Sequence, residues 1–354
     1  MEEEKYMRRC IELARNGRCN TAPNPMVGAV IVCDGQIIGE GYHVRCGEAH
    51  AEVNAIRSVA NPALLQRSTL YVSLEPCAHY GKTPPCADLI VEKQIPRIVI
   101  GCQDPFAKVA GRGIRKLLDA GREVKVGVLE AECKALIRRF VTFHTRRRPY
   151  VTLKWAQSAD GYLDIARREG SPVVLSNPLT AMLVHKKRAE HSAIMVGTRT
   201  ALLDNPSLTV RRWYGPQPVR VVLDRGLTLP PTLHLLDGSA PTLVFTAGQQ
   251  PREARPQVEY ITVDYGREVL PQVLEALYAR GLQSLLVEGG SRLLQSFIDA
   301  RLWDEAFIER SPLMLHAGVE APVMPPHLPC ETDKAFGHTL LHYTADGADG
   351  LPAD

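Results

Sequence analysis

Four residues in the first third of the chain have the types and spacing of a catalytic zinc site. His50 and Glu52 lie two positions apart at the start of an expected helix, Cys77 follows a proline, and Cys86 comes nine positions later. An imidazole and two thiolates can hold zinc tetrahedrally and leave one position open for water, whose pKa the metal lowers. The pattern predicts a zinc site with His50, Cys77 and Cys86 as ligands.

The position of Glu52 points to proton transfer beside this metal. A carboxylate two residues after the histidine can lie next to the zinc without binding it, take a proton from water and deliver one to a departing amine. Cys77 is expected after a strand and Cys86 at the start of a helix, whose positive N-terminal end favours thiolate. A buried structural histidine with two unrelated thiols is the alternative, and the order His, Glu, Pro-Cys, Cys favours a zinc-dependent deaminase.

The remaining cysteines do not show a second ligand pattern. Cys46 and His43 lie close upstream of His50, but we assign Cys46 no role. An odd total of nine cysteines argues for buried thiols and ligands in a reducing compartment rather than for a disulfide framework. Six thiols are expected to be packing residues. These are Cys10, Cys19, Cys33, Cys102, Cys133 and Cys330.

The elements that position the zinc site alternate as in a layered α/β domain. Apolar spacing predicts a helix near residues 6–14, and strands are expected at 27–33 and 36–43 around an Asp34-Gly35 turn. Helices are then expected at 49–60, 86–94 and 113–121, and strands at 68–74, 97–101 and 123–129. An Arg-rich helical connection from about residue 130 ends at Pro149, so we place a domain boundary there, with domains 1–147 and 148–354.

The second half repeats the α/β alternation. Strands are expected at 151–156, 192–197, 219–224, 242–247 and 284–289, with helices at 179–191, 273–281 and 291–300. The turn Glu288-Gly289-Gly290 ends an apolar strand and opens a helix, so its backbone amides could hold a cofactor phosphate. The tail after Pro325 is too rich in Pro, Gly, His and Asp for a structural prediction.

Composition excludes several classes of protein. The chain has 354 residues, 45% hydrophobic and 23% charged, which suits two globular domains. A net charge of +3 provides no strong field for nucleic acid or a membrane, although a small anionic ligand fits. Without a secretory signal or an apolar run of membrane length, we expect a cytoplasmic protein.

Longer segments resemble one known family. The insert AHYGKTPP between Cys77 and Cys86 departs from the shorter P-C-x-x-C spacing of nucleoside deaminases. This insert, with PNPMVGAVIV before it and GRGIRKLLDAG after it, is similar to the deaminase half of the bifunctional riboflavin-biosynthesis deaminase/reductases. The resemblance continues in RPYVTLKWAQSADGYL, RAEHSAIMVGTRTALLDNPSLTVR and LLVEGGSRLLQSFI.

The resemblance implies a cytidine-deaminase-like N-terminal domain and a dihydrofolate-reductase-like C-terminal domain. The first would remove the 2-amino group of 2,5-diamino-6-(5-phosphoribosylamino)pyrimidin-4-one with Zn²⁺, and the second would reduce the ribosyl group to ribityl with NADPH. It implies deaminase substrate contacts at Asn24, His43, His79 and Lys82. Cofactor contacts are implied at Ala156, Thr200, Asp204, Gly289 and Gly290. Reductase substrate contacts are implied at Ser171, Arg188, Leu208, Arg211 and Glu288.

One of the departures from the family and two other interpretations concern function. After Ser171 the chain has PVVLS where the family has a Trp-Ile-Thr run, which changes one cofactor contact. The chain could instead be another pyrimidine, purine or tRNA deaminase with a noncatalytic nucleotide-binding C-terminal domain, or a zinc-stabilised binding protein. Retention of Glu52 argues against the latter, because a structural zinc needs no proton carrier. The expected partners are phosphorylated pyrimidines, without nucleic acid or membrane, and a homo-oligomer is left open.

Overall fold

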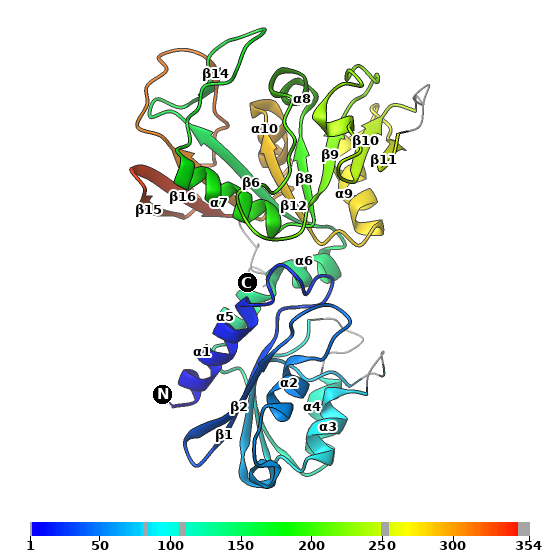
Figure 1. The fold of residues 1–354 in the computed structure, drawn as a ribbon, viewed down its shortest axis with the longest axis vertical. Helices are drawn as coiled ribbons and strands as arrows, with labels where there is room; N and C mark the ends of the chain where they lie inside the picture. The colour runs from blue at the N-terminus through cyan, green and yellow to red at the C-terminus, as the bar shows by residue number, and fades with distance from the viewer. Residues whose placement is uncertain (1, 79, 81–83, 106–110, 249–254, 346–354) are drawn as a thin grey trace. The chain divides into compact units, whose positions relative to one another are not determined.

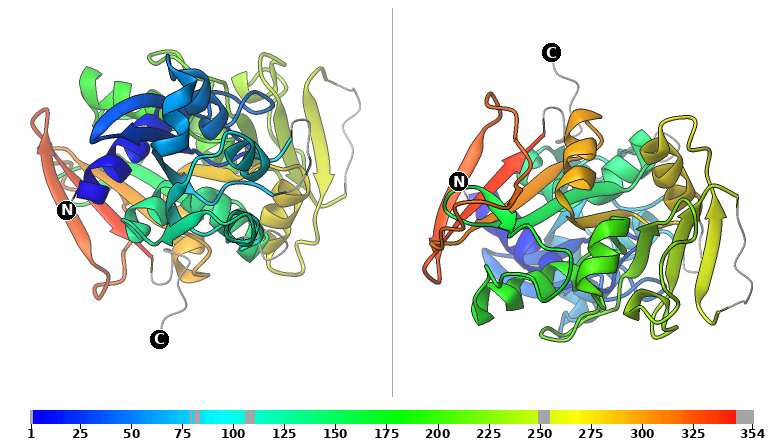
Figure 2. Two further views of the ribbon diagram at one scale, coloured as in Figure 1. Left: turned by 90° about the horizontal axis from the view of Figure 1, so that it is seen from below. Right: turned by 90° about the horizontal axis from the view of Figure 1, so that it is seen from above.

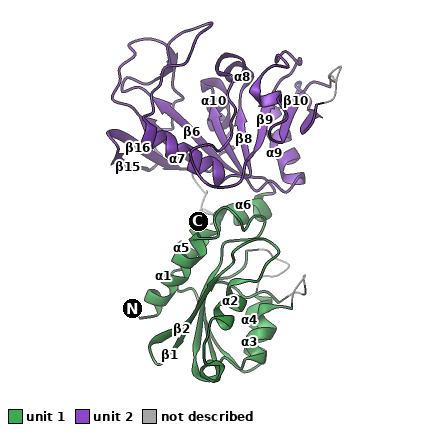
Figure 3. Cartoon of the chain, viewed as in Figure 1, with its two compact units in different colours: residues 1–146 green, residues 147–354 purple. Residues whose placement is uncertain are grey.

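The computed structural model describes residues 2–78, 80, 84–105, 111–248 and 255–345. The chain divides into two compact units, residues 1–146 and 147–354, which are coloured separately in Figure 3. Within the described ranges, no helix combines the length and the apolar character that a membrane crossing needs.

Unit 1 is built on a mixed sheet with the strand order β2-β1-β3-β4-β5 (Figure 1). Its strands are β1 (Gly28–Cys33), β2 (Gln36–Tyr42), β3 (Thr69–Leu74), β4 (Arg97–Cys102) and β5 (Glu123–Val126). β1 pairs antiparallel with β2 and β3, whereas β3, β4 and β5 are parallel. The described helices are α1 (Glu2–Arg15), α2 (Ala51–Arg57), α3 (Cys86–Glu92), α4 (Arg112–Asp119), α5 (Glu130–Leu136) and α6 (Arg138–Arg146), with a 3-10 helix at Pro62–Arg67.

Helices cover both faces of this sheet, so every residue of β1 is buried. Ala29 and Ile31 pack in one core with residues of α2, α3 and α4. Val30 and Val32 point to the other face and pack with residues of α1 and α5. The alternation of side chains along a strand therefore produces a three-layer α/β/α unit.

Most of the expected elements of unit 1 are present. Asp34 and Gly35 both have positive φ between β1 and β2, as in the predicted tight hairpin. The expected strand at 123–129 ends earlier, at Val126, since Gly127 turns with a φ of 95°. The expected helical connection consists of two helices, α5 and α6.

Unit 2 has a larger sheet with the order β11-β10-β9-β8-β12-β6-β13-β16-β15. Pairing is parallel from β11 to β13 and antiparallel from β13 through β16 to β15. The strands are β6 (Tyr150–Gln157), β7 (Tyr162–Asp164), β8 (Ala193–Val196), β9 (Val219–Leu223), β10 (Thr242–Thr246), β11 (Val258–Thr262), β12 (Ser284–Gly289), β13 (Glu305–Arg310), β14 (Val319–Glu320), β15 (Cys330–Ala335) and β16 (His338–Thr344). β7 and β14 pair separately.

Helices lie against both faces of this second sheet, as the views in Figure 2 also show. The described helices are α7 (Pro178–Ala189), α8 (Thr198–Asp204), α9 (Val269–Ala279) and α10 (Ser291–Asp299), with a 3-10 helix at His234–Leu236. One core joins α9 and α10 to inward residues such as Leu153, Met195 and Val287. The opposite core joins α8 to residues such as Ile194 and Leu286.

In the tail after Pro325, for which the sequence supports no prediction, residues 330–344 form an antiparallel hairpin of β15 and β16. Its two-residue turn consists of Phe336 and Gly337, both with positive φ. The strands β11 and β13 and the helix α8 were not expected either. The predicted strands at 151–156 and 284–289 and the helix at 291–300 are confirmed within a residue or two.

Candidate active sites

The three expected zinc ligands converge in unit 1. The Nδ1 atom of His50 lies 3.6 Å from Sγ of Cys77 and 3.4 Å from Sγ of Cys86. Bonds of about 2.3 Å to sulfur and about 2.0 Å to nitrogen at a tetrahedral angle require nitrogen and sulfur to be about 3.5 Å apart. Among the described residues, these three form the group of possible ligands whose atoms all lie within 4.8 Å of one another. The donor set therefore fits zinc in both chemistry and spacing.

Local structure places each donor and favours the thiolate form of Cys77. His50 is the residue before α2, and Cys86 is the first residue of α3. The backbone N–H of Cys86 donates to Sγ of Cys77 at 3.3 Å, and the N–H of Ala87 donates to the Cys77 carbonyl at 3.1 Å. Hydrogen bonds from Cys86 and His50 hold the pKa of the Cys77 thiol well below its usual range, in agreement with a thiolate ligand.

Glu52 lies in the first turn of α2 with 3% of its surface exposed. Burial, followed by the charge of Cys77, raises the pKa of its carboxyl to about 7. A carboxyl with this pKa can both accept and release a proton near neutral pH.

Asn24 and His43 lie beside the metal ligands. The Nδ2 atom of Asn24 is 3.0 Å from Nε2 of His43, and the His43 ring meets the His50 ring edge-on at 5.3 Å. Since an amide nitrogen can only donate, Nε2 accepts and Nδ1 carries the proton that goes to the Ala49 carbonyl, 3.1 Å away. Burial lowers the pKa of His43, which favours this neutral ring.

Two other expected contacts, His79 and Lys82, lie outside the described residues. The structure corrects the expectation that six further thiols are packing residues. Cys330 is exposed and Cys19 is partly exposed, whereas the other four are buried. Cys330 lies on β15, the last strand in the order of the unit 2 sheet among the described residues.

Glu75 is a residue of this site that the sequence interpretation did not identify. Its buried carboxylate accepts backbone N–H groups from Asp104, Gly111, Gly113 and Ile114 at 2.9 to 3.3 Å. Gly113 can approach because it lacks a side chain, since a Cβ there would lie 2.0 Å from the Pro76 carbonyl oxygen. Glu75 thus fastens the segment before Cys77 to the start of α4. In the sequence, the position of this acid directly before Pro76-Cys77 was the local feature that could have indicated its role.

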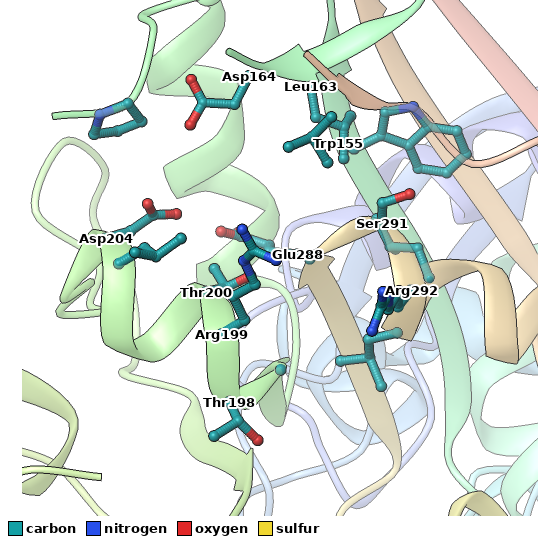
Figure 4. A pocket seen from close by; sticks show the side chains of 18 of the residues that line it. Trp155, Leu163, Asp164, Thr198, Arg199, Thr200, Asp204, Glu288, Ser291 and Arg292 are labelled. Carbon is teal, nitrogen blue, oxygen red and sulfur yellow. The ribbon is translucent and has the colours of Figure 1, made fainter. Parts of the chain in front are cut away.

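Unit 2 contains a cavity of about 620 Å³ at the carboxyl ends of β6, β8 and β12. These strands are parallel neighbours, so their carboxyl ends meet at one edge of the sheet. Figure 4 shows side chains from the different elements around the cavity. The expected residues that line it are Ala156, Thr200, Asp204, Glu288, Gly289 and Gly290.

Gly290 permits a close approach between α8 and the turn after β12. A Cβ on Gly290 would lie 2.8 Å from Oγ1 of Thr200, so a larger residue would displace that hydroxyl. Gly197 N–H also donates to the Gly289 carbonyl at 2.9 Å. Asp204, at the end of α8, forms an ion pair with Arg167, which also holds Asp164 at 2.6 Å.

Arg188 and Glu288 form a two-point ion pair that borders this cavity. Nε and Nη2 of Arg188 lie 2.8 and 2.6 Å from the two Glu288 oxygens. Burial raises the pKa of Glu288, but the charge of Arg188 outweighs this effect and the pKa stays below its usual value. Lys154, a second residue missed from the sequence, lines the same cavity, and burial lowers its pKa. In the sequence, the presence of a lysine within the apolar strand VTLKWA could have indicated that Lys154 lines a functional cavity.

The other expected substrate contacts do not line the cavity itself. Leu208 and Arg211 belong to a segment whose Thr209 carbonyl accepts from Nη1 of Arg188 at 3.2 Å. Ser171 is exposed, and its neighbour Pro172 lines the cavity. The structure therefore brings Arg188, Leu208 and Arg211 together and leaves Ser171 at the rim.

Two family models match the chain. The cytidine and deoxycytidylate deaminase zinc-binding region matches residues 1–102, and the RibD C-terminal domain matches residues 149–336. Curated relatives match across both units. The chain is 43% identical to the riboflavin biosynthesis protein RibD of Bacillus amyloliquefaciens, over 90% of this chain and 87% of the relative. It is 35% identical to that of Escherichia coli, over 89% of each.

Solved structures also match the chain over both units. A diaminohydroxyphosphoribosylaminopyrimidine deaminase/5-amino-6-(5-phosphoribosylamino)uracil reductase from Thermotoga maritima is 38% identical with a TM-score of 0.88, covering 97% of this chain and 99% of that chain. Acinetobacter baumannii RibD is 32% identical with a TM-score of 0.85 and the same coverage. Matches over both units favour two enzymes in one chain over a deaminase with a noncatalytic second domain.

Proposed function

Because the chain belongs to the RibD family of bifunctional riboflavin-biosynthesis deaminase/reductases, we propose that residues 1–147 carry the deaminase and residues 148–354 the reductase. The division into units at residues 146 and 147 and the separate matches of the two family models support this assignment. We further propose that this chain uses the substrates that the Thermotoga relative's name states.

The convergence of His50, Cys77 and Cys86 beside the buried Glu52 carries the deaminase assignment. These three side chains would hold zinc, which when bound acidifies water to supply a nucleophile near neutral pH. Glu52 takes a proton from water and returns one to the departing amine nitrogen, so that ammonia leaves and oxygen replaces the 2-amino group. Asn24, His43, His79 and Lys82 bind the ring edges and the phosphate.

A single substitution tests this assignment and the independence of the two halves. Glu52→Gln should keep zinc but lose ammonia release by at least about a hundredfold, the usual contribution of a general acid/base. It should leave NADPH-dependent reduction of the deaminated substrate unchanged. Glu48→Gln, an exposed neighbour paired with Arg45, is the matched control. Normal ammonia release from zinc-replete Glu52→Gln would contradict the role, and loss of both activities in a folded protein would contradict the division.

For the reductase, the supporting observation is a cavity that collects the expected residues from three strand ends. NADPH supplies the hydride when bound, so the protein has to hold and orient the two reactants. Ala156, Thr200, Asp204, Gly289 and Gly290 would contact the cofactor. Ser171, Arg188, Leu208, Arg211 and Glu288 would contact the phosphorylated substrate, and the changed segment after Ser171 weakens cofactor binding more than it affects reaction.

NADPH absorbance with the deaminated phosphate substrate tests the reductase. We expect oxidation with NADPH, slower oxidation with NADH, and a raised KM for the substrate in Arg211→Ala. Arg280→Ala, an exposed arginine paired with Glu259, controls for loss of one positive charge. No oxidation with either cofactor would contradict the assignment, and equal rates would contradict the preference.

We also place the protein in the cytoplasm as an enzyme of small phosphorylated pyrimidines that binds neither nucleic acid nor membranes. The small net charge of +3 supports this, because nucleic-acid binding requires a concentrated basic surface. A homo-oligomer is compatible with the proposal, and sedimentation of the purified chain would test it.

A further inference from the structure

The segment that carries Leu208 and Arg211 is held by side chains rather than by a sheet. Leu208 is 2% exposed and has a φ of 52°, a conformation that a branched side chain disfavours and that its surroundings must maintain. Three side chains from outside the segment bond to its consecutive backbone groups. Those side chains are His185, Arg188 and Gln217.

Gln217 holds the middle of the segment at two points. Its Oε1 accepts the N–H of Val210 at 2.7 Å, and its Nε2 donates to the Val210 carbonyl at 3.1 Å. One amide side chain thus replaces the pair of hydrogen bonds that a neighbouring strand would make.

His185 and Arg188 hold the two flanking residues from one face of α7, since they are three positions apart on that helix. Nδ1 of His185 accepts the N–H of Arg211 at 3.0 Å, and Nη1 of Arg188 donates to the Thr209 carbonyl at 3.2 Å. His185 is 6% exposed. Burial, then the charges of Arg188 and Arg211, lower its pKa to about 4, so the ring remains an acceptor at neutral pH.

The held backbone directs the Arg211 side chain. Nη1 of Arg211 donates to Oγ1 of Thr209 at 2.8 Å, within the same segment. If the segment moved, the guanidinium and Leu208 would move with it, and misplacement by about 1 Å is enough to impair a bound substrate.

We propose that His185 and Gln217 are positioning residues of the reductase, which set the geometry of Leu208 and Arg211 for the phosphorylated substrate. This inference rests on the proposed function of that segment. The two residues act on substrate binding through the backbone of residues 209–211 and touch neither cofactor nor reacting atoms.

Gln217→Ala should raise the KM for the phosphorylated substrate about tenfold, the ratio that roughly 1.4 kcal/mol produces. The kcat, the KM for NADPH and ammonia release by the deaminase should stay within about twofold, because the effect is confined to uniform binding of one substrate. Gln217→Glu keeps the acceptor for the Val210 N–H, but it places a second oxygen against the Val210 carbonyl. The substrate KM should therefore rise by a similar factor, although the side chain has the same size.

Gln272 offers a matched control. Its Oε1 accepts the N–H of Asp264 at 2.8 Å and its Nε2 donates to the Asp264 carbonyl at 2.9 Å, so it makes the same pair of bonds elsewhere in unit 2. Gln272→Ala should leave the substrate KM unchanged. A rise in KM equal to that of Gln217→Ala would assign both effects to general stability and overturn the proposal.

His185 is tested by a conservative rescue. His185→Asn places an amide oxygen near the position of Nδ1 and should restore the substrate KM, whereas His185→Leu should raise it about tenfold. If His185→Leu does not fold, the Gln217 variants and His185→Asn still decide the question. A normal KM in Gln217→Ala while Arg211→Ala raises it would overturn the positioning role alone. A normal KM in Arg211→Ala would overturn both this inference and the proposed site.

Discussion

Arg188 and Glu288 are bound to each other at two points, with Nε 2.8 Å from one carboxylate oxygen and Nη2 2.6 Å from the other. The third nitrogen of Arg188 donates to the Thr209 carbonyl. All three nitrogens of the guanidinium therefore already have protein partners. Arg188 keeps Glu288 charged and holds residues 208–211 through the Thr209 carbonyl, and a phosphate would have to share the guanidinium with these partners.

Replacing Arg188 by alanine should abolish reduction and destabilise unit 2. The variant leaves Glu288 buried without its partner, and breaking such a pair costs about 3 kcal/mol or more. The stability of unit 2 can be measured in the full chain, because all three tryptophans lie in that unit, at Trp155, Trp213 and Trp303. Urea unfolding followed by tryptophan fluorescence reports on unit 2, and ammonia release shows whether unit 1 is intact. An Arg188→Ala protein with wild-type unfolding would contradict the role of the pair.

Glu75 should control zinc affinity although it is not a ligand. Glu75→Ala removes the acceptor of four backbone N–H groups two residues before Cys77. We expect zinc affinity to fall at least about tenfold, as for other residues that orient ligands. Competition with a chromogenic chelator measures this directly. Glu123→Ala removes an exposed carboxylate paired with Arg97 and should leave zinc affinity unchanged. Equal affinities of the Glu75 and Glu123 variants would refute the prediction.

Removing the buried guanidinium of Arg220 should destabilise unit 2. It is fully buried, and its guanidinium donates to Thr242 Oγ1 at 2.9 Å and to the carbonyls of His234 and Ala240 at 2.7 and 2.8 Å. Arg220→Met leaves these acceptors unsatisfied and should lower the unfolding free energy of unit 2 by about 3 kcal/mol. Arg280→Met should cost less than about 1 kcal/mol, because Arg280 pairs at the surface. Comparable losses of unfolding free energy in the two variants would contradict the conclusion that burial makes Arg220 more costly to replace than Arg280.

His185 should make the stability of unit 2 sensitive to mild acid. Its pKa of about 4 in the folded protein lies below the ordinary value of 6.5. The neutral ring therefore contributes stability that is fully present above pH 6.5 and is lost as the pH falls toward 4. His185→Asn should flatten that part of the curve, while Gln217→Ala should shift stability equally at pH 7 and 4.5. Fluorescence-detected urea unfolding at these pH values checks the prediction, and parallel curves for wild type and His185→Asn would contradict it.

Local patterns were sufficient to select the three side chains that converge in unit 1, because His50 and Cys86 each belong to the first turn of a predicted helix. The same holds for the Asp34-Gly35 hairpin, whose residues favour positive φ. The Phe336-Gly337 hairpin has the same geometry but begins with a residue that rarely adopts it, and β15 has no buried face to produce alternation. The sequence therefore offered no signal for this part of the sheet.

The contacts that the sequence could not supply are those between residues far apart along the chain. Arg188 and Glu288 are 100 positions apart, and His185 and Arg211 are 26 apart. No spacing rule relates such pairs, since only the parallel order of β8, β12 and β6 and the packing of α7 bring them together. The resemblance identified Arg188, Arg211 and Glu288 individually, whereas the role proposed for His185 could be inferred only from its hydrogen bond in the structure.

The two thiols expected to bind zinc each have an anchor outside the eight residues between them. Cys77 is fixed from one side by Glu75 and from the other by the Ala87 N–H, and Cys86 belongs to α3. We therefore expect these anchors to survive changes between Cys77 and Pro85, provided that Pro85 keeps its place before α3. This makes the stretch between the thiols a natural site for loop grafting: a shorter stretch from another deaminase could redirect the enzyme to a different amino heterocycle without rebuilding its metal centre.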